Sequence, residues 1–237
     1  MTLLRPRLYL LDVEGTVAPI SLVYEQLFPY ARAHFGEFLA QNGGSAAVNG
    51  DLNLLAVENR SDPEAPRFTD AADSGQAVAY LNWLMDRDRK STALKSLQGR
   101  VWKQGFECGE LKGTLFDDVP AALARWIVDG QVAIYSSGSV DALRLLFRYS
   151  IFGDLTERIA AYFDTRTGPK TASSSYTAIA AAMNLLPGRI LFLSDVVREL
   201  DPAREAGLDT RLVVRDGNAP VADTHGHIAI DSLNCIP

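Results

Sequence analysis

Short apolar runs that end in polar residues recur along the chain and predict the strands of a parallel sheet. Three such runs cover residues 8–11, 132–135 and 190–193. Buried parallel strands read as continuous apolar runs rather than alternating ones, because helices cover both faces of such a sheet. We therefore expect these runs to lie in one sheet.

Helical patterns lie between and after these runs, and together with the runs they predict an α/β fold. Asp201 and Pro202 read as an N-cap followed by proline at the first helical position, and Gly207 would close that helix. Repeated βα units predict a doubly wound parallel sheet. The expected helices are 119–128, 140–148, 173–184 and 201–207, and further strands are expected at 162–164, 211–214 and 228–230.

The segment between the first two runs has a different pattern. Apolar residues at helical spacing from Ser21 predict an amphipathic helix, which Phe28 and Pro29 kink or break. Residues 43–66 are polar and rich in Gly, Asn, Asp and Pro, and they predict a long loop with room for one short helix. Further helices are expected at 75–86 and 91–102.

These patterns predict two domains: a core of residues 1–19 and 110–237, and a helical cap of residues 20–109 inserted after the first strand. The 237 residues are 47% hydrophobic and 22% charged, as in ordinary soluble proteins. The net charge of −6 disfavours nucleic acid or an anionic membrane as a partner.

The cellular location is predicted from the N-terminus and the cysteines. The first apolar run is too short for a signal peptide or a membrane span. Cys108 and Cys235 show no metal-site spacing, and we expect them to be unpaired. We therefore expect a cytoplasmic protein.

Acidic residues follow the first run at the sheet edge where ligands collect in such folds. Asp12 ends the run, and Glu14 and Gly15 follow it. A carboxylate placed there can attack phosphorus and form an aspartyl-phosphate, and a second carboxyl group can exchange protons with the reacting groups. The alternative is an acidic turn that caps a helix near Thr16.

The other runs end in groups that complete a phosphate site. Asp195 would place a second carboxylate beside Asp12, and Mg²⁺ suits such a pair because it binds through one or two carboxylates and retained waters. Ser136 and Ser137 can bind phosphate oxygens at a helix N-terminus, and Lys170 can supply a cation. Helix capping by Asp195 and the serines, and an ordinary surface lysine, are the alternatives.

The order of these residues resembles the four motifs of the haloacid dehalogenase superfamily. With glutamate at position 14, where most members have aspartate, the chain resembles the enolase-phosphatase family of methionine salvage. Further matching blocks, which extend the resemblance over most of residues 8–207, lie at 27–32, 88–95, 97–99, 109–113, 135–139, 163–165 and 199–201.

The resemblance implies an Mg²⁺-dependent enzyme with one ion per subunit. It would enolise 2,3-diketo-5-methylthiopentyl-1-phosphate and then hydrolyse the phosphate through an aspartyl-phosphate to give the acireductone. It also implies a monomer whose partner is a small phosphorylated metabolite. The implied roles are nucleophile and metal ligand for Asp12, acid/base and metal association for Glu14, metal binding for Asp195, substrate binding for Ser136 and Ser137, and substrate binding and catalysis for Lys170.

Several points stay open at this stage. Glu14 is a candidate base for enolisation, and no other is named. Residues around Leu27, Phe28 and Trp102 are expected to receive the methylthio end of the substrate. One rival is a phosphatase for another small phosphorylated metabolite; a second is a receiver-type phosphoacceptor, which is about half this length. His225 and His227 lack supporting ligands at metal-site spacing, so we assign them no metal.

Overall fold

The computed structural model describes residues 5–237, which divide into two compact units. Unit 1 contains the chain up to Val23 together with Lys112–Pro237, and unit 2 is Tyr24–Leu111. The assignment of the inserted segment as a cap stays a prediction. Within the described residues, no helix has the length and apolar character needed to cross a membrane.

Unit 1 is built on a six-stranded sheet in which every pairing is parallel. Its order is β3-β2-β1-β4-β5-β6, so the chain winds outward from β1 and then crosses to β4 on the other side. This confirms the doubly wound sheet and puts the switch point between β1 and β4. The strands are β1 (Leu8–Leu11), β2 (Gln131–Tyr135), β3 (Ala161–Phe163), β4 (Ile190–Ser194), β5 (Asp209–Val213) and β6 (Ile228–Ile230).

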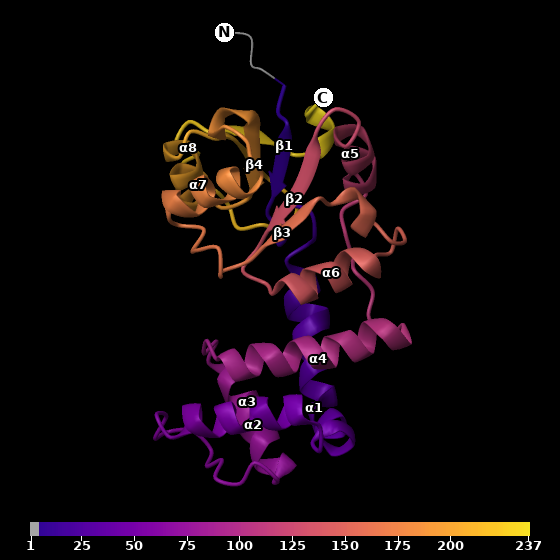
Figure 1. The fold of residues 1–237 in the computed structure, drawn as a ribbon, viewed down its shortest axis with the longest axis vertical. Helices are drawn as coiled ribbons and strands as arrows, with labels where there is room; N and C mark the ends of the chain where they lie inside the picture. The colour runs from indigo at the N-terminus through magenta and orange to yellow at the C-terminus, as the bar shows by residue number, and fades with distance from the viewer. Residues whose placement is uncertain (1–4) are drawn as a thin grey trace. The chain divides into compact units, whose positions relative to one another are not determined.

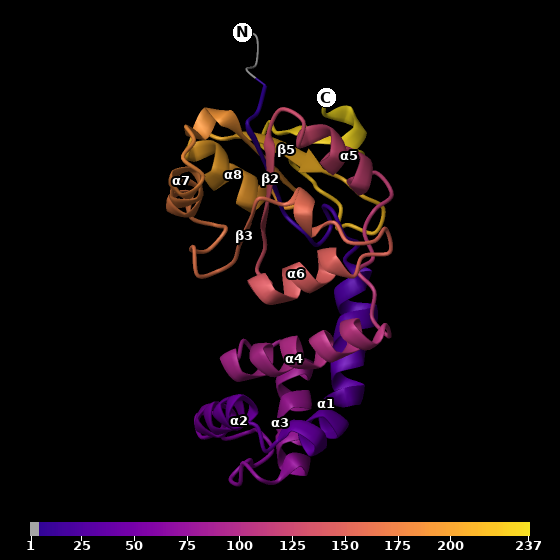
Figure 2. The ribbon, with the colours of Figure 1, turned by 45° about the vertical axis from the view of Figure 1, so that its right-hand side comes forward.

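Helices cover the sheet of unit 1 (Figures 1 and 2). On one face, α7 and α8 bury Tyr176 and Leu200 against Leu8 and Leu10 of β1. Tyr9 points to the other face and stacks on Trp126 of α5, with ring centroids 4.4 Å apart. The helices are α5 (Val119–Trp126), α6 (Val140–Arg148), α7 (Ser173–Ala182) and α8 (Val197–Glu205), with single 3₁₀ turns at Thr156–Arg158, Pro187–Arg189 and Leu233–Cys235.

The expected N-cap role of Asp201 is wrong. Helix α8 begins four residues earlier, at Val197, because the amides of Glu199 and Leu200 already bond to the carbonyl of Val196. Pro202 therefore lies inside the helix, where its missing N–H leaves one intrahelical bond unmade. The first turn of α8 therefore follows the end of β4 after only two residues.

Unit 2 is helical. A π-helix, η1 (Leu22–Leu27), begins in the last two residues of the first segment of unit 1 and leads into α1 (Phe28–Asn42), and the change of helix type occurs beside Pro29. Pro29 does not break α1, because the first turn of a helix needs no amide hydrogen there. The other helices are α2 (Ala46–Asn59), α3 (Ser74–Asp86) and α4 (Thr92–Cys108), and all four α-helices contribute to one apolar core.

Helix α2 corrects the prediction of a long loop at 43–66. Its fourteen residues start at Ala46 and are capped by Ser45, whose side chain accepts from the amide of Val48. Val48, Leu52 and Leu55 recur at helical spacing and are buried in the core of unit 2. These three positions are a weak periodic signal because other apolar residues of the helix, Leu54 and Val57, are exposed, but burial of one face stabilises the helix.

Candidate active site

Asp12 follows β1 directly and is almost completely buried. Its Oδ1 accepts a hydrogen bond from the amide of Val13 at 2.7 Å, and its own amide continues the pairing with β4 by donating to Leu193. Gly15 has a φ of +74°, and a Cβ at this position would collide with the carboxylate of Asp195. The loop after β1 therefore packs directly against the residue that follows β4.

Lys170 joins Asp12 and Glu199 in one polar cluster. Its Nζ contacts Oδ1 of Asp12 and donates to Oε2 of Glu199 at 2.9 Å. Burial alone would lower the pKa of Lys170, but the charges of Asp12 and Glu199 outweigh it and raise that pKa. The ammonium therefore stays charged, and the alternative of an ordinary surface lysine is wrong.

Two residues of this cluster were not among the predicted site residues. Ser194, the last residue of β4, places its Oγ 3.3 Å from Oδ2 of Asp12 and 3.1 Å from Oε2 of Glu199. Burial and the charge of Asp12 raise the pKa of Glu199. The sequence signal for Ser194 was its position at a strand end. Glu199 was missed because it lies in the first turn of α8, and the sequence predicted a later start for that helix.

Glu14 lies beside Ser136. The Oγ of Ser136 donates to Oε2 of Glu14 at 3.3 Å and accepts from the amide of Gly138 at 3.0 Å. Burial and the charge of Asp12 raise the pKa of Glu14, so this carboxylate takes up a proton more readily than an exposed glutamate. Ser136 is fully buried and Ser137 is exposed, whereas Ser139 caps α6 by accepting from Ala142.

Asp195 has the properties expected of a metal ligand. Its Oδ1 is buried and has no hydrogen-bond partner among residues 5–237, and Val196 rather than Asp195 occupies the N-cap position of α8. Burial and the charge of Asp12 raise the pKa of Asp195 to about 7. A divalent cation would satisfy the orphaned oxygen and offset the repulsion between the carboxylates.

The donor set fits Mg²⁺ through two carboxylates. Across the described part of the chain, no group of three or more His, Cys, Asp or Glu side chains is arranged to hold a metal. Glu14, the predicted third ligand, accepts from Ser136 and stays a prediction. Asp12 and Asp195 supply two carboxylates, and Mg²⁺ commonly binds one or two carboxylates together with phosphate oxygens and water.

The remaining candidates lie outside this cluster. Both cysteines are free, as predicted. His225 Nδ1 and His227 Nε2 lie 2.6 and 3.1 Å from the carboxylate of Asp201, so Asp201 engages both rings. Their role in this arrangement is to tie the segment before β6 to α8.

Comparison with known proteins agrees with this geometry. The family model of haloacid dehalogenase-like hydrolases matches residues 6–207. Enolase-phosphatase E1 of Synechococcus elongatus is 51% identical over 215 residues, which cover 90% of each chain, and that of Pseudomonas fluorescens is 42% identical over 97% of this chain and 96% of its own. The chain belongs to the enolase-phosphatase E1 family of haloacid dehalogenase-like hydrolases. This confirms the resemblance found in the sequence.

Solved structures support the same fold. The UTR4 protein of Saccharomyces cerevisiae matches with a TM-score of 0.79 and 35% identity, over 96% of this chain and 98% of its own. A dehalogenase matches with a TM-score of 0.56 and 17% identity, over 99% and 96% of the two chains, and shows the fold alone. The UTR4 protein and this dehalogenase thus share the fold of this chain.

Proposed function

We propose that the protein is a bifunctional enolase-phosphatase of methionine salvage. Its substrate would be 2,3-diketo-5-methylthiopentyl-1-phosphate and its product the acireductone. Family membership supports this activity. The observation that carries the phosphatase half is the contact of Lys170 with both Asp12 and Glu199 at the switch point of the sheet.

Phosphate removal would proceed in two displacements. A carboxylate oxygen of Asp12 attacks phosphorus, and the bond from phosphorus to the substrate oxygen breaks while Glu14 donates a proton to that oxygen. Water then attacks the aspartyl-phosphate and gives its proton to Glu14, which releases inorganic phosphate and restores Asp12. The raised pKa of Glu14 suits this exchange.

Lys170 and the serines have supporting roles in this proposal. The ammonium of Lys170 offsets the charge of the carboxylates and of the transferring phosphoryl oxygens. Ser136 orients Glu14, and Ser136 and Ser137 together with the amides that follow β2 bind the phosphorylated substrate.

Asp12 and Asp195 would hold one Mg²⁺ per subunit. When bound, the ion neutralises charge on the phosphate oxygens and fixes the phosphate in front of the nucleophile. The unpartnered Oδ1 of Asp195 supports this assignment.

Enolisation would come first, with Glu14 as the candidate base. A carboxylate whose pKa is raised by burial is a stronger base, so it can remove a proton from the carbon next to the carbonyl while water gives a proton to the carbonyl oxygen. Glu14 would then carry the proton that it donates to the leaving oxygen. One residue can therefore serve both halves of the reaction in sequence.

We propose that Leu27, Phe28 and Trp102 of unit 2 recognise the methylthio end of the substrate. The rings of Phe28 and Trp102 stack with centroids 6.4 Å apart, and Trp102 Nε1 donates to the carbonyl of Leu27 at 2.7 Å. Phe28→Ala should raise KM for the methylthio substrate in a folded enzyme; an unchanged KM would exclude this role. A cytoplasmic location and a monomeric state complete the proposal.

Incubation of the purified protein with the diketo phosphate and Mg²⁺ tests the function. We expect the absorbance of the acireductone to rise as inorganic phosphate is released. Phosphate release without that absorbance change would favour a phosphatase for another metabolite. A long-lived phosphoprotein without turnover would favour the receiver-type phosphoacceptor.

A further inference from the structure

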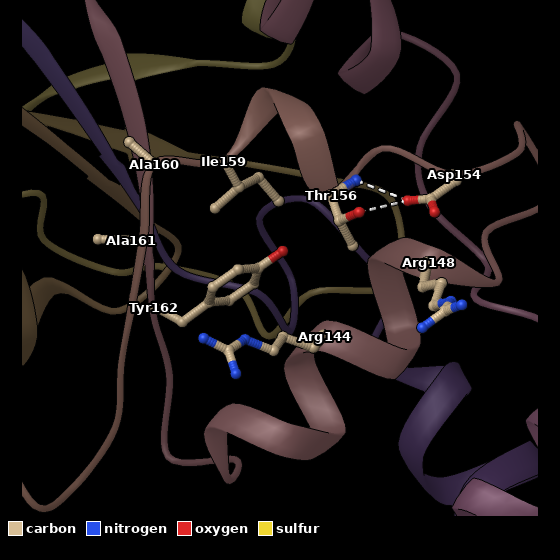
Figure 3. Close-up of a pocket in the computed structure, with 8 residues that line it drawn as sticks. All are labelled: Arg144, Arg148, Asp154, Thr156, Ile159, Ala160, Ala161 and Tyr162. Atoms are coloured by element: carbon tan, nitrogen blue, oxygen red, sulfur yellow. Dashed lines mark hydrogen bonds between the residues drawn. The ribbon is translucent and has the colours of Figure 1, made fainter.

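A second polar pocket lies in unit 1 and shares no residue with the candidate active site. It is a cavity of about 400 Å³ beside β3, the strand at one edge of the sheet. Figure 3 shows the side chains that surround it. They are Arg144, Arg148, Asp154, Thr156, Ile159, Ala160, Ala161 and Tyr162.

The pocket carries more positive than negative charge, with two arginines and one aspartate in its lining. Arg144 and Arg148 are one helical turn apart on α6, both are exposed, and neither forms an ion pair with any residue in 5–237. The guanidinium of Arg144 lies 5.7 Å from the ring centroid of Tyr162. The one acidic side chain of the lining, Asp154, accepts from the amide and hydroxyl of Thr156 at 2.9 and 2.6 Å.

The hydroxyl of Tyr162 adds an unused donor. It is buried and has no hydrogen-bond partner among the described residues, and in Figure 3 it points toward the side of the pocket formed by Thr156 and Ile159. Burial raises the pKa of Tyr162 to about 12, so the hydroxyl keeps its proton at neutral pH. Buried polar groups without a partner are rare in native proteins and often mark the place of a water molecule or an ion.

We propose that this pocket binds the phosphate group of a small molecule. Two guanidinium groups on one helix face provide planar sets of donors that match phosphate oxygens. The cavity lies within the range of roughly 300–1,000 Å³ found for small-molecule sites. Ile159, Ala160 and Ala161 supply apolar wall for the carbon part of such a ligand. The proposal does not depend on the proposed function.

Titration of the ¹⁵N-labelled protein by NMR, with inorganic phosphate and separately with ribose 5-phosphate, tests this site. We expect saturable shifts of the amides of residues 144–162, separate from any shifts of the loop after Asp12. Tighter binding of ribose 5-phosphate would assign the site to a phosphorylated metabolite, and equal binding would assign it to free phosphate. Absence of saturable shifts at 144–162 with both probes would overturn the proposal.

Variants separate this site from the active site. Arg144→Gln/Arg148→Gln should weaken binding at 144–162 by about tenfold or more, because hydrogen bonds to charged groups are lost, while the shifts near Asp12 persist. Arg60→Gln/Lys90→Gln, which removes two exposed charges from unit 2, should change neither set of shifts. Tyr162→Phe should weaken binding at the same amides several-fold. Unchanged affinity in the double arginine variant would overturn the proposal.

Discussion

Lys170 donates to Glu199 at 2.9 Å while the same ammonium contacts Asp12. Ser194 also contacts both carboxylates, since its Oγ lies within 3.3 Å of Asp12 and of Glu199. The position of Lys170 beside the proposed nucleophile therefore depends on Glu199, a residue on a different element. Glu199 is thus expected to act by positioning Lys170 and not by touching the substrate.

Glu199→Gln tests that relationship. The neutral amide removes the charge that holds Lys170, so we expect kcat/KM for phosphate release to fall by about 10²-fold, as for a displaced catalytic group. The folded enzyme should remain, which circular dichroism can check. Glu205→Gln, an exposed change on the same helix, should keep full activity. Wild-type kcat/KM in Glu199→Gln would show that Lys170 needs no such support.

Lys170→Gln removes the cation itself. We expect kcat for phosphate release to fall by about 10³-fold, because the transferring oxygens lose a preorganised positive charge. Lys112→Gln, which removes an exposed lysine from unit 1, serves as the matched control. If both variants release phosphate at the same rate, Lys170 has no catalytic role.

Asp195→Asn should weaken Mg²⁺ binding by about tenfold or more, measured by calorimetry, because one of two carboxylate ligands is lost. The wild-type affinity should also fall as the pH drops below about 7, since burial and the charge of Asp12 raise the pKa of Asp195 and the protonated acid does not ligate. That pH dependence should largely vanish in Asp195→Asn. Asp216→Asn, an exposed change, should leave it intact. An unchanged affinity in Asp195→Asn would remove it from the ligand set.

Asp118 and Arg215 form a stabilising pair that also supports the loop after Asp12, because Arg215 donates to the carbonyl of Thr16 at 3.2 and 3.3 Å. Nη1 and Nη2 of Arg215 lie 2.8 and 2.9 Å from the two oxygens of Asp118, which also accepts from the hydroxyl of Ser232 and the amide of Leu233. Asp118→Ala leaves a buried arginine without its carboxylate partner, so we expect a loss of about 3–5 kcal/mol in the free energy of unfolding at neutral pH. Urea denaturation measures this loss, and Asp117→Ala, an exposed neighbour, should cost little.

The same pair predicts a pH dependence of stability. Burial would raise the pKa of Asp118, but the hydrogen bonds from Arg215 and Ser232 outweigh it and lower that pKa. The stabilisation is therefore complete above the unfolded pKa of about 3.9 and is lost as the pH falls through the folded value. The stability difference between wild type and Asp118→Ala should shrink in acid. A difference that stays constant down to about pH 2 would contradict this account.

The parts of the site that follow strands were predictable from sequence. Asp12 and Asp195 stand where buried apolar runs end, and the winding of a parallel sheet brings such ends to one edge. Glu199 was not predictable in the same way, because its position depends on where α8 begins. Proline at 202 suggested a later start, but tertiary packing of Leu200 holds the helix together across it.

Helix α2 is a part of the fold that the sequence did not predict correctly. The Gly, Asn, Asp and Pro residues of 43–66 suggested a loop, and burial of Val48, Leu52 and Leu55 against the other helices of unit 2 identifies the helical face. Local propensity is a weak guide where a few apolar residues decide the packing. The π-helix before Phe28 carries no sequence signal that we recognise.

The most direct test of the account is chemical trapping of the proposed intermediate on Asp12. The enzyme is quenched in acid during turnover of the diketo phosphate and reduced with borohydride, which converts an aspartyl-phosphate to homoserine, and the peptide that contains position 12 is analysed by mass spectrometry. We predict homoserine at position 12 in the wild type, none in Asp12→Asn, and a loss of phosphate release in that variant on the order of 10⁴-fold or more. Homoserine at another position, or full turnover by Asp12→Asn, would contradict the account.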